Sequence, residues 1–262
     1  MKFVLFFLLV IGAAVAILFA VFPRWDIEVT SLFWHPQGGF MLALDPWAKT
    51  LRAFGHFIPW ITVAPAFVVI VLKFLFPHLR MFMPARAAVL LALTMAVGPG
   101  LLVNGIFKAE WGRPRPVHVE EFGGKLAYVP WYDTNGTCPS NCSFVSGEGA
   151  LSFWMVAPAS LVPPGPLRVL ALSTAVGFGV IVGGLRIGFG GHFFTDVVLS
   201  GVLVVALIAL TRYWLYDRPN APSDARVERA IGRAGFATRK ALIRLWLGLR
   251  ALRKETGQDK TS

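Results

Sequence analysis

The chain has 262 residues, of which 56% are hydrophobic and only 15% are charged, and its formal net charge is +11. The mean hydropathy of +0.64 indicates a membrane protein and excludes an ordinary soluble enzyme. The positive charge would allow nucleic-acid binding, but a membrane chain without an aromatic-rich recognition module argues against it.

Six apolar runs approach the roughly 20 residues that a helix needs to cross a bilayer. They cover about residues 3–22, 57–76, 88–107, 149–162, 169–187 and 193–210, and the fourth is the shortest. The first run ends without a small-residue cleavage site, so we interpret it as a retained anchor and not as a signal peptide. The predicted fold class is all-α, a polytopic membrane protein with six transmembrane helices in a membrane domain of residues 1–215.

The positive charges of the short loops predict the orientation. With six spans, one side of the membrane receives Lys73, Arg80, Arg86, Arg168 and the C-terminal residues. That side is therefore cytoplasmic, and it holds both termini. Segments 23–56, 108–147 and 186–192 then face the periplasm or its equivalent, and we expect the protein in the inner (plasma) membrane.

The segment between the first two spans carries Trp25, Trp34 and Trp47 and few charges. Tryptophan is enriched at membrane interfaces, so we interpret this segment as an aromatic belt, and a short amphipathic or interfacial element is the alternative.

Two cysteines, Cys138 and Cys142, lie in the long outward segment, where oxidation can occur. A local disulfide is favoured over a metal site, because there are only two thiols and no pair of histidines beside them.

Three groups of polar residues lie on the outward side, where burial near hydrocarbon is costly unless they are paired or face water. In the first group, Lys108 closes the third span, and Arg113 and Arg115 are each followed by proline. Proline prevents a simple continuation of the helix, so we expect these cations on an irregular stretch. The alternative is that these cations anchor the helix ends at the membrane interface. Lys and Arg are, however, usually enriched in cytoplasmic loops, whereas these lie on the outward side.

The second group is Ser146, Gly147 and Glu148, at the start of the fourth span. Unpaired backbone N–H groups and the helix dipole favour an anion there. Ordinary capping by Ser146, with Glu148 in the first turn, is the alternative.

The third group is Arg186, His192 and Asp196, where the last two are spaced i, i+4. That spacing predicts that the carboxylate of Asp196 accepts a hydrogen bond from one imidazole nitrogen of His192 and leaves the other free. A histidine held in this way is prepared as a nucleophile or base. Together with Lys108 and Arg115, these residues predict a pocket for a tetrahedral dianion such as phosphate.

The glycines of "VGFGVIVGGLRIGFGGH" predict close packing of the fifth helix and a turn after it that is free to bend. The C-terminal segment 216–262 is predicted as a separate basic tail, since 11 Lys and Arg face 5 Asp and Glu from Asp217 onward. Apolar residues such as Ile231, Phe236 and Trp246 alternate with these cations, which favours an interfacial helix on anionic lipid headgroups.

The three groups resemble the motifs of the type 2 phosphatidic acid phosphatase superfamily, which read K-x6-R-P, P-S-G-H and S-R-x5-H-x3-D. The first motif corresponds to Lys108, Arg115 and Pro116, the second to residues 145–148, and the third to Leu185, Arg186, His192 and Asp196. The resemblance covers a catalytic core of about residues 88–210. Val145, Leu185 and Glu148 depart from the pattern, and Glu148 replaces a histidine.

The resemblance implies a lipid phosphatase without metal or other cofactor. His192 would form a phosphohistidine and Asp196 would orient it. Lys108, Arg115, Ser146, Gly147 and Arg186 would bind the phosphoryl oxygens. In the family the histidine of the second motif protonates the leaving alcohol, so Glu148 becomes a candidate general acid if its pKa is raised.

The predicted function is removal of a phosphate monoester or pyrophosphate from a lipid headgroup on the periplasmic side. Candidate substrates are phosphatidic acid, phosphatidylglycerol phosphate, undecaprenyl diphosphate and lipid A, with a lean toward lipid A because Glu148 suggests specialised recognition. The alternatives are a lipid phosphotransferase and a noncatalytic lipid-phosphate binding protein or transporter.

Overall fold

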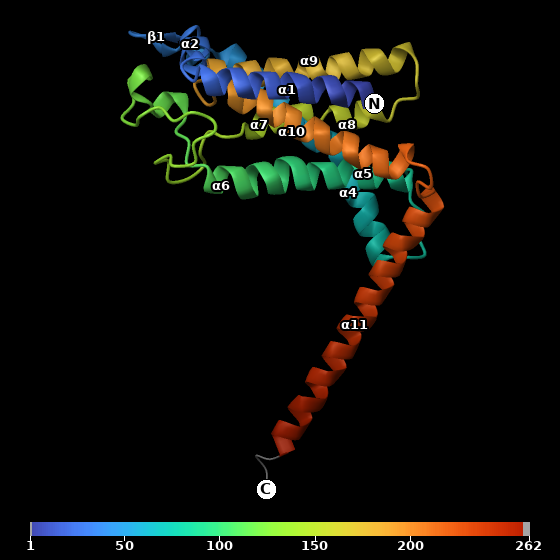
Figure 1. Cartoon of the computed structure of the whole chain (residues 1–262). Helices are drawn as coiled ribbons and strands as arrows, with labels where there is room; N and C mark the ends of the chain where they lie inside the picture. Colours follow the sequence, from blue (N-terminus) through green and yellow to red (C-terminus); the bar gives the residue numbers. More distant parts are fainter. Residues whose placement is uncertain (1, 259–262) are drawn as a thin grey trace.

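The computed structural model describes residues 2–258, with side chains described for residues 6–249. The long helices lie side by side as a bundle, and one helix, α11, extends away from it (Figure 1). Within the described chain, four helices are long and apolar enough to cross a membrane. A fifth crossing is added if residues 6–21 and 25–31, which meet at a bend of 100°, count as one span. The prediction of a helical, multi-pass membrane protein is confirmed, whereas six crossings are more than these helices supply by length and composition.

The N-terminal half contains α1 (Lys2–Val21), α2 (Trp25–Ser31), an antiparallel pair of β1 (Trp34–His35) and β2 (Gly39–Phe40), α3 (Met41–Leu44), α4 (Pro46–Leu75) and α5 (Ala85–Met95). After residue 115 the chain contains two single turns, η2 (Pro116–His118) and η3 (Glu120–Phe122), then α7 (Gly147–Phe153), α8 (Val156–Ser160), α9 (Pro166–Gly188), α10 (Phe194–Arg212), η4 (Tyr213–Asp217) and α11 (Asp224–Gln258).

The third predicted span is one long helix that changes its winding. α5 continues as the π-helical segment η1 (Ala96–Phe107) and ends in α6 (Lys108–Glu110). Pro99 lies inside η1, and proline cannot donate the usual backbone hydrogen bond, so the winding widens there. This helix places Asn104 and Lys108 at its outward end.

Helix α4 begins well before the apolar run predicted at residue 57. Its N-terminus is capped by Asp45, whose side chain accepts a hydrogen bond from the backbone N–H of Trp47 at 2.7 Å, and Pro46 occupies the first turn. The predicted interfacial segment 23–56 therefore ends in a helix, and this helix carries Arg52 and His56.

The fourth predicted span consists of two short helices, α7 and α8, with a break at residues 154 and 155. Phe153 of α7 packs against glycines of both neighbouring helices, since a Cβ added to Gly179 of α9 or Gly201 of α10 would lie 2.3 or 2.8 Å from its ring. Trp154 is fully buried, and its indole nitrogen donates to the hydroxyl of Thr94 at 2.9 Å. Because this segment lies in the protein core, its broken backbone is shielded from lipid.

The glycine pattern in α9 is confirmed where helices touch. Added Cβ atoms at Gly179 and Gly183 would collide with Phe153 and Val197, while Gly190 adopts a φ of +64° in the turn after the helix. This turn carries the chain from α9 to His192.

Helix α11 is attached to the bundle by two ion pairs. Lys73 contacts Glu228 at 3.0 Å, and Arg86 contacts Asp224 at 2.9 Å. Beyond them α11 runs across the direction of the bundle, starting from the end of the bundle to which the N-terminus is nearer (Figure 1). Phe236 is exposed on it. Residues 259–262 of the predicted tail lie outside the described residues.

Candidate active site

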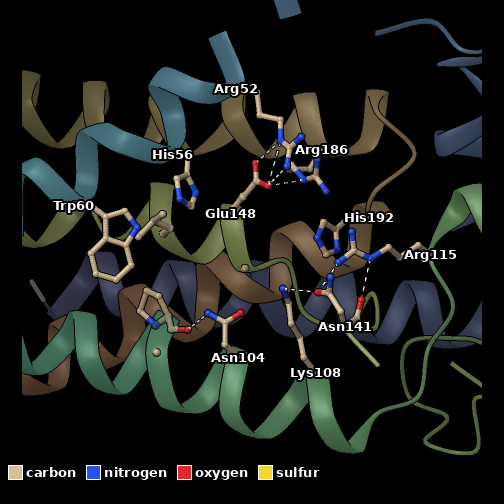
Figure 2. Close-up of a pocket in the computed structure, with 14 residues that line it drawn as sticks. Arg52, His56, Trp60, Asn104, Lys108, Arg115, Asn141, Glu148, Arg186 and His192 are labelled. Carbon is tan, nitrogen blue, oxygen red and sulfur yellow. Dashed lines mark hydrogen bonds and ion pairs between the residues drawn. The ribbon is translucent and has the colours of Figure 1, made fainter. Parts of the chain in front are cut away.

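A cavity of about 300 Å³ opens between α4, η1, α6, α7 and the turn after α9. Its polar and aromatic lining residues are Arg52, His56, Trp60, Asn104, Lys108, Arg115, Asn141, Glu148, Arg186 and His192, all labelled in Figure 2. The cavity therefore collects four Lys and Arg side chains, two histidines and one carboxylate from segments far apart in the sequence.

His192 is buried, and its ring is oriented by a backbone carbonyl. Its Nδ1 lies 2.7 Å from the carbonyl oxygen of Ser143 and 3.8 Å from Oδ2 of Asp196. A carbonyl oxygen can only accept, so Nδ1 carries the proton and Nε2 keeps a free lone pair. The predicted direct hydrogen bond from His192 to Asp196 is thus wrong in detail, because Ser143 is the hydrogen-bond partner.

Burial lowers the pKa of His192 to about 4, and the adjacent Asp196 offsets only part of this effect. The imidazole is consequently neutral near pH 7, which is the form that can act as a nucleophile.

Asp196 belongs to a buried network behind the cavity. Its carboxylate accepts from the hydroxyl of Ser143 at 2.5 Å, from the backbone N–H of Phe193 at 2.8 Å and from Arg113 at 2.5 Å. Arg113 also pairs with Asp26 of α2 at 2.8 Å. Asp196 therefore positions His192 indirectly, through Ser143 and the start of α10.

Lys108 and Arg115 meet on one side of the cavity through Asn141. The Lys108 Nζ lies 3.3 Å from Asn141 Oδ1, and Arg115 donates to the same oxygen at 2.7 Å and to the Asn141 carbonyl at 3.0 Å. Asn141 adopts a φ of +50° and stands beside Cys142, which is joined to Cys138 by a disulfide. This loop therefore holds the Asn141 side chain between Lys108 and Arg115, where its Oδ1 accepts hydrogen bonds from both.

The N-terminus of α7 adjoins these cations. A Cβ added to Gly147 would lie 3.0 Å from Lys108 Nζ and 3.2 Å from Asn104 Oδ1, so only glycine leaves this approach open. The hydroxyl of Ser146 is buried and accepts from the backbone N–H of Gly149 at 3.1 Å. In this arrangement Ser146 caps α7, and its predicted contact with phosphate stays a prediction.

Arg186 lies deep in the cavity wall. Among the described residues its Nε is buried without a hydrogen-bond partner, although it stands 3.5 Å from Glu148. A Cβ added to Gly191 would lie 2.3 Å from the Arg186 guanidinium. The glycine turn therefore leaves room for the guanidinium beside the Glu148 carboxylate.

Glu148 is held by a second arginine that the sequence analysis missed. Arg52 of α4 donates to its carboxylate through three contacts of 2.6, 2.9 and 3.2 Å. Burial alone would raise the pKa of Glu148, but the hydrogen bonds from Arg52 and the charge of Arg186 outweigh burial and hold this pKa below its usual range. Glu148 is therefore an ionised carboxylate.

Six of the predicted site residues line the cavity, namely Lys108, Arg115, Gly147, Glu148, Arg186 and His192, while Ser146 and Asp196 lie behind its wall. The missed residues include Arg52, His56 and Trp60, which the sequence analysis assigned to an interfacial segment and an apolar run. Their spacing of four residues places them on one face of a helix and was the available signal. No group of three or more His, Cys, Asp or Glu side chains within the described part of the chain is placed to hold a metal ion.

In this helical membrane protein a histidine faces a cluster of cations. Such an arrangement is typical of enzymes that transfer phosphoryl groups through a covalent intermediate. The model of the PAP2 superfamily matches residues 87–220, and the chain belongs to this superfamily.

The chain is also similar to curated lipid A 4'-phosphatases. It is 36% identical over 193 residues to that of Francisella tularensis subsp. novicida, an alignment that covers 72% of this chain and 85% of the relative. It is 41% identical over 122 residues to that of Rhizobium leguminosarum, which covers 45% of this chain and 52% of the relative. No solved structure matches the chain. The protein is therefore a membrane phosphatase that removes phosphate from a lipid.

Proposed function

We propose that His192 is the nucleophile of this phosphatase. The observation that carries the proposal is the fixed tautomer, in which the Ser143 carbonyl holds Nδ1 at 2.7 Å and Nε2 is left for the cavity. Lys108, Arg115 and Arg186 supply positive charge where the phosphoryl oxygens would lie, and the N-terminus of α7 with Gly147 adds backbone donors.

The reaction has two steps. His192 Nε2 forms a bond to phosphorus while the bond to the leaving oxygen breaks and its electron pair stays with that oxygen, which takes up a proton. Water then attacks the phosphohistidine, the nitrogen–phosphorus bond breaks, and inorganic phosphate leaves. The cations stabilise the charge of both transition states, and this scheme requires no metal ion or other cofactor.

Glu148 acts as a positioning residue in this proposal. A carboxylate bound by Arg52 and close to Arg186 has no proton to donate, so its surroundings do not support the predicted general-acid role. It instead links two arginines at the cavity mouth.

The proposed substrate is the phosphate monoester of a lipid A type headgroup. The support is the alignment with the Francisella phosphatase, which spans most of both chains. Phosphatidic acid, phosphatidylglycerol phosphate and undecaprenyl diphosphate are the competing substrates.

For topology we propose six crossings in the inner membrane, formed by α1, α4, α5 with η1, residues 149–162, α9 and α10. Both termini would lie in the cytoplasm and the cavity would face the periplasm. The N-terminus lies nearer the end of the bundle where α11 starts, away from the site loops, which supports placing the N-terminus and the start of the tail on the side opposite the cavity (Figure 1). α11 would lie on anionic lipid headgroups, and nucleic acid is not a proposed partner.

The proposal is tested by phosphate release from these four lipids in detergent micelles with EDTA present. Wild type is expected to prefer the lipid A type monoester, and His192→Gln is expected to lose at least about 10⁴-fold in kcat. Brief reaction with ³²P-labelled substrate is expected to label wild type at an acid-labile histidine. Headgroup binding without phosphate release would indicate a noncatalytic binding protein or transporter, and capture of the phosphate by an added alcohol in preference to water would indicate a phosphotransferase.

A further inference from the structure

The cavity requires a proton donor for the leaving alcohol. An aliphatic alkoxide is a strong base, and a positioned acid accelerates its departure by about 10²–10⁴-fold. Glu148 is ionised in its pair with Arg52, and the arginines stay protonated and act as anion binders. His192 is engaged as the nucleophile. The described lining residues that remain as proton donors are His56 and Lys108.

Lys108 is located with the phosphate-binding groups. It contacts Asn141 at 3.3 Å, shares this residue with Arg115, and adjoins Gly147 at the N-terminus of α7. A cation in that place contacts the phosphoryl oxygens that stay on phosphorus, and not the oxygen that departs.

His56 comes from the opposite wall. It follows Arg52 by one helical turn on α4, and it lines both the main cavity and a smaller adjoining hollow that also contains Arg52 and Glu148. Figure 2 shows His56 and His192 on opposite sides of Glu148. In phosphoryl transfer the leaving oxygen departs opposite to the attacking atom, so an acid across the cavity from His192 lies on the side where the alcohol emerges.

The ring of His56 is accessible for proton exchange. The residue is exposed, and its ring packs edge-to-face on Phe57 at 5.5 Å. Within the described residues no hydrogen bond is made to either of its ring nitrogens, unlike His192, whose Nδ1 is held by Ser143.

We propose that His56 is the general acid and base of this phosphatase, an inference that rests on the proposed nucleophilic role of His192. As the phosphorus–oxygen bond breaks and its electron pair stays on the leaving oxygen, protonated His56 gives that oxygen its proton. Neutral His56 then takes a proton from the attacking water as the nitrogen–phosphorus bond of His192 breaks. In this chain the proposed proton donor lies on α4. The second-motif position is occupied by Glu148, which binds Arg52.

The test compares two phosphate monoesters that carry the same long alkyl chain, one of an aliphatic alcohol and one of a nitrophenol. Nitrophenolate is a stable anion and leaves without a proton. His56→Gln is expected to lower kcat/KM for the aliphatic ester by about 100-fold or more and for the nitrophenyl ester by less than about threefold. It is also expected to give a burst of nitrophenolate, because the phosphohistidine accumulates when its hydrolysis is slowed.

His78→Gln, on an exposed histidine outside the cavity, is the matched control and is expected to behave as wild type with both esters. Equal losses on the two esters in His56→Gln, or no loss on either, would overturn the role of His56. His192→Gln separates the two proposals: it is expected to lose turnover of both esters, and retained turnover would overturn the nucleophile and, with it, this inference.

Discussion

At the scale of single residues, two side chains decide the chemistry of the cavity through their immediate partners. The carbonyl of Ser143 accepts a hydrogen bond from Nδ1 of His192 and so fixes its tautomer. Arg52 forms an ion pair with Glu148 and so stabilises its ionised form. Neither partner belongs to the three sequence motifs. The motif residues thus depend on contacts that come from other parts of the chain.

Replacement of the Glu148 carboxylate separates a positioning role from an acid role. We expect Glu148→Gln to keep the alkaline limb of the pH–rate profile and to reduce kcat/KM by about fivefold, the effect of losing a partly exposed ion pair worth about 1 kcal/mol. Steady-state kinetics with the lipid substrate between pH 5 and 9 provide the measurement. Loss of the alkaline limb, with its recovery in Glu148→His, would instead establish Glu148 as the acid.

His192 is expected to titrate far below an ordinary histidine, with a pKa of about 4 set mainly by burial. An unfolded histidine has a pKa of about 6.5, so the folded protein binds fewer protons between these values. The contribution of His192 to stability is therefore complete above about pH 6.5 and is lost as the pH falls toward 4. NMR titration of histidine-labelled protein in micelles, assigned with His192→Gln, measures this value, and a midpoint near 6.5 would contradict the burial of the His192 ring described above.

At the scale of elements, a buried ionic network joins α2, the loop after α6 and α10. Arg113 is fully buried between Asp26 at 2.8 Å and Asp196 at 2.5 Å, and it also donates to the carbonyl of Val129 at 2.8 Å. Two carboxylates around one guanidinium hold these elements together behind the cavity, and none of the three side chains lines it.

Removal of the Arg113 charge is expected to destabilise the protein. Arg113→Met leaves two buried carboxylates without their cation, and we expect the free energy of unfolding to fall by about 3–5 kcal/mol. Thermal unfolding in detergent provides the measurement. The neighbouring variant Arg115→Met is the control, since it should keep the melting temperature and raise KM. The reverse pattern would place Arg113 in the binding site.

The contact between α7 and α9 depends on a glycine that faces Phe153. Gly179→Ala places a methyl group 2.3 Å from Phe153 and is expected to destabilise by about 1–3 kcal/mol, whereas Gly177→Ala on the same helix meets no atom within 4 Å and is expected to be neutral or slightly stabilising. Denaturation curves of the two variants in one detergent give the comparison. Equal stability would show that α7 does not pack against α9 in this way.

At the scale of the whole molecule, α11 crosses the direction of the bundle (Figure 1). We propose that this helix binds the membrane surface, with its cations facing anionic headgroups. We expect trypsin to cleave the tail slowly in nanodiscs with anionic lipid and rapidly in zwitterionic ones, with protection weakened at about 1 M salt. Gel analysis of the cleavage time course measures this, and equal rates in both lipids would argue against headgroup binding.

Much of the site was predictable because its residues are spaced by local geometry. The i, i+4 pair of His192 and Asp196 lies at one helix start, and Gly147 begins another helix. Arg52 was missed because the apolar run that marks its helix starts only after it, so its spacing of four residues from His56 was not recognised as helical. The break between α7 and α8 was also hidden, since apolar composition is the same for a lipid-facing span and for a segment buried in protein.

Hydropathy and residue spacing are local properties, and they were enough to predict the class of protein, the motifs and the cationic character of the site. The folded structure was needed to show that a carbonyl orients His192, that Arg52 holds Glu148 ionised, and that His56 faces the cavity opposite His192. These features depend on side chains that lie far apart in the chain and meet only when α4 packs against α7. The charge of a buried group is set by such neighbours, and spacing along the chain does not contain them.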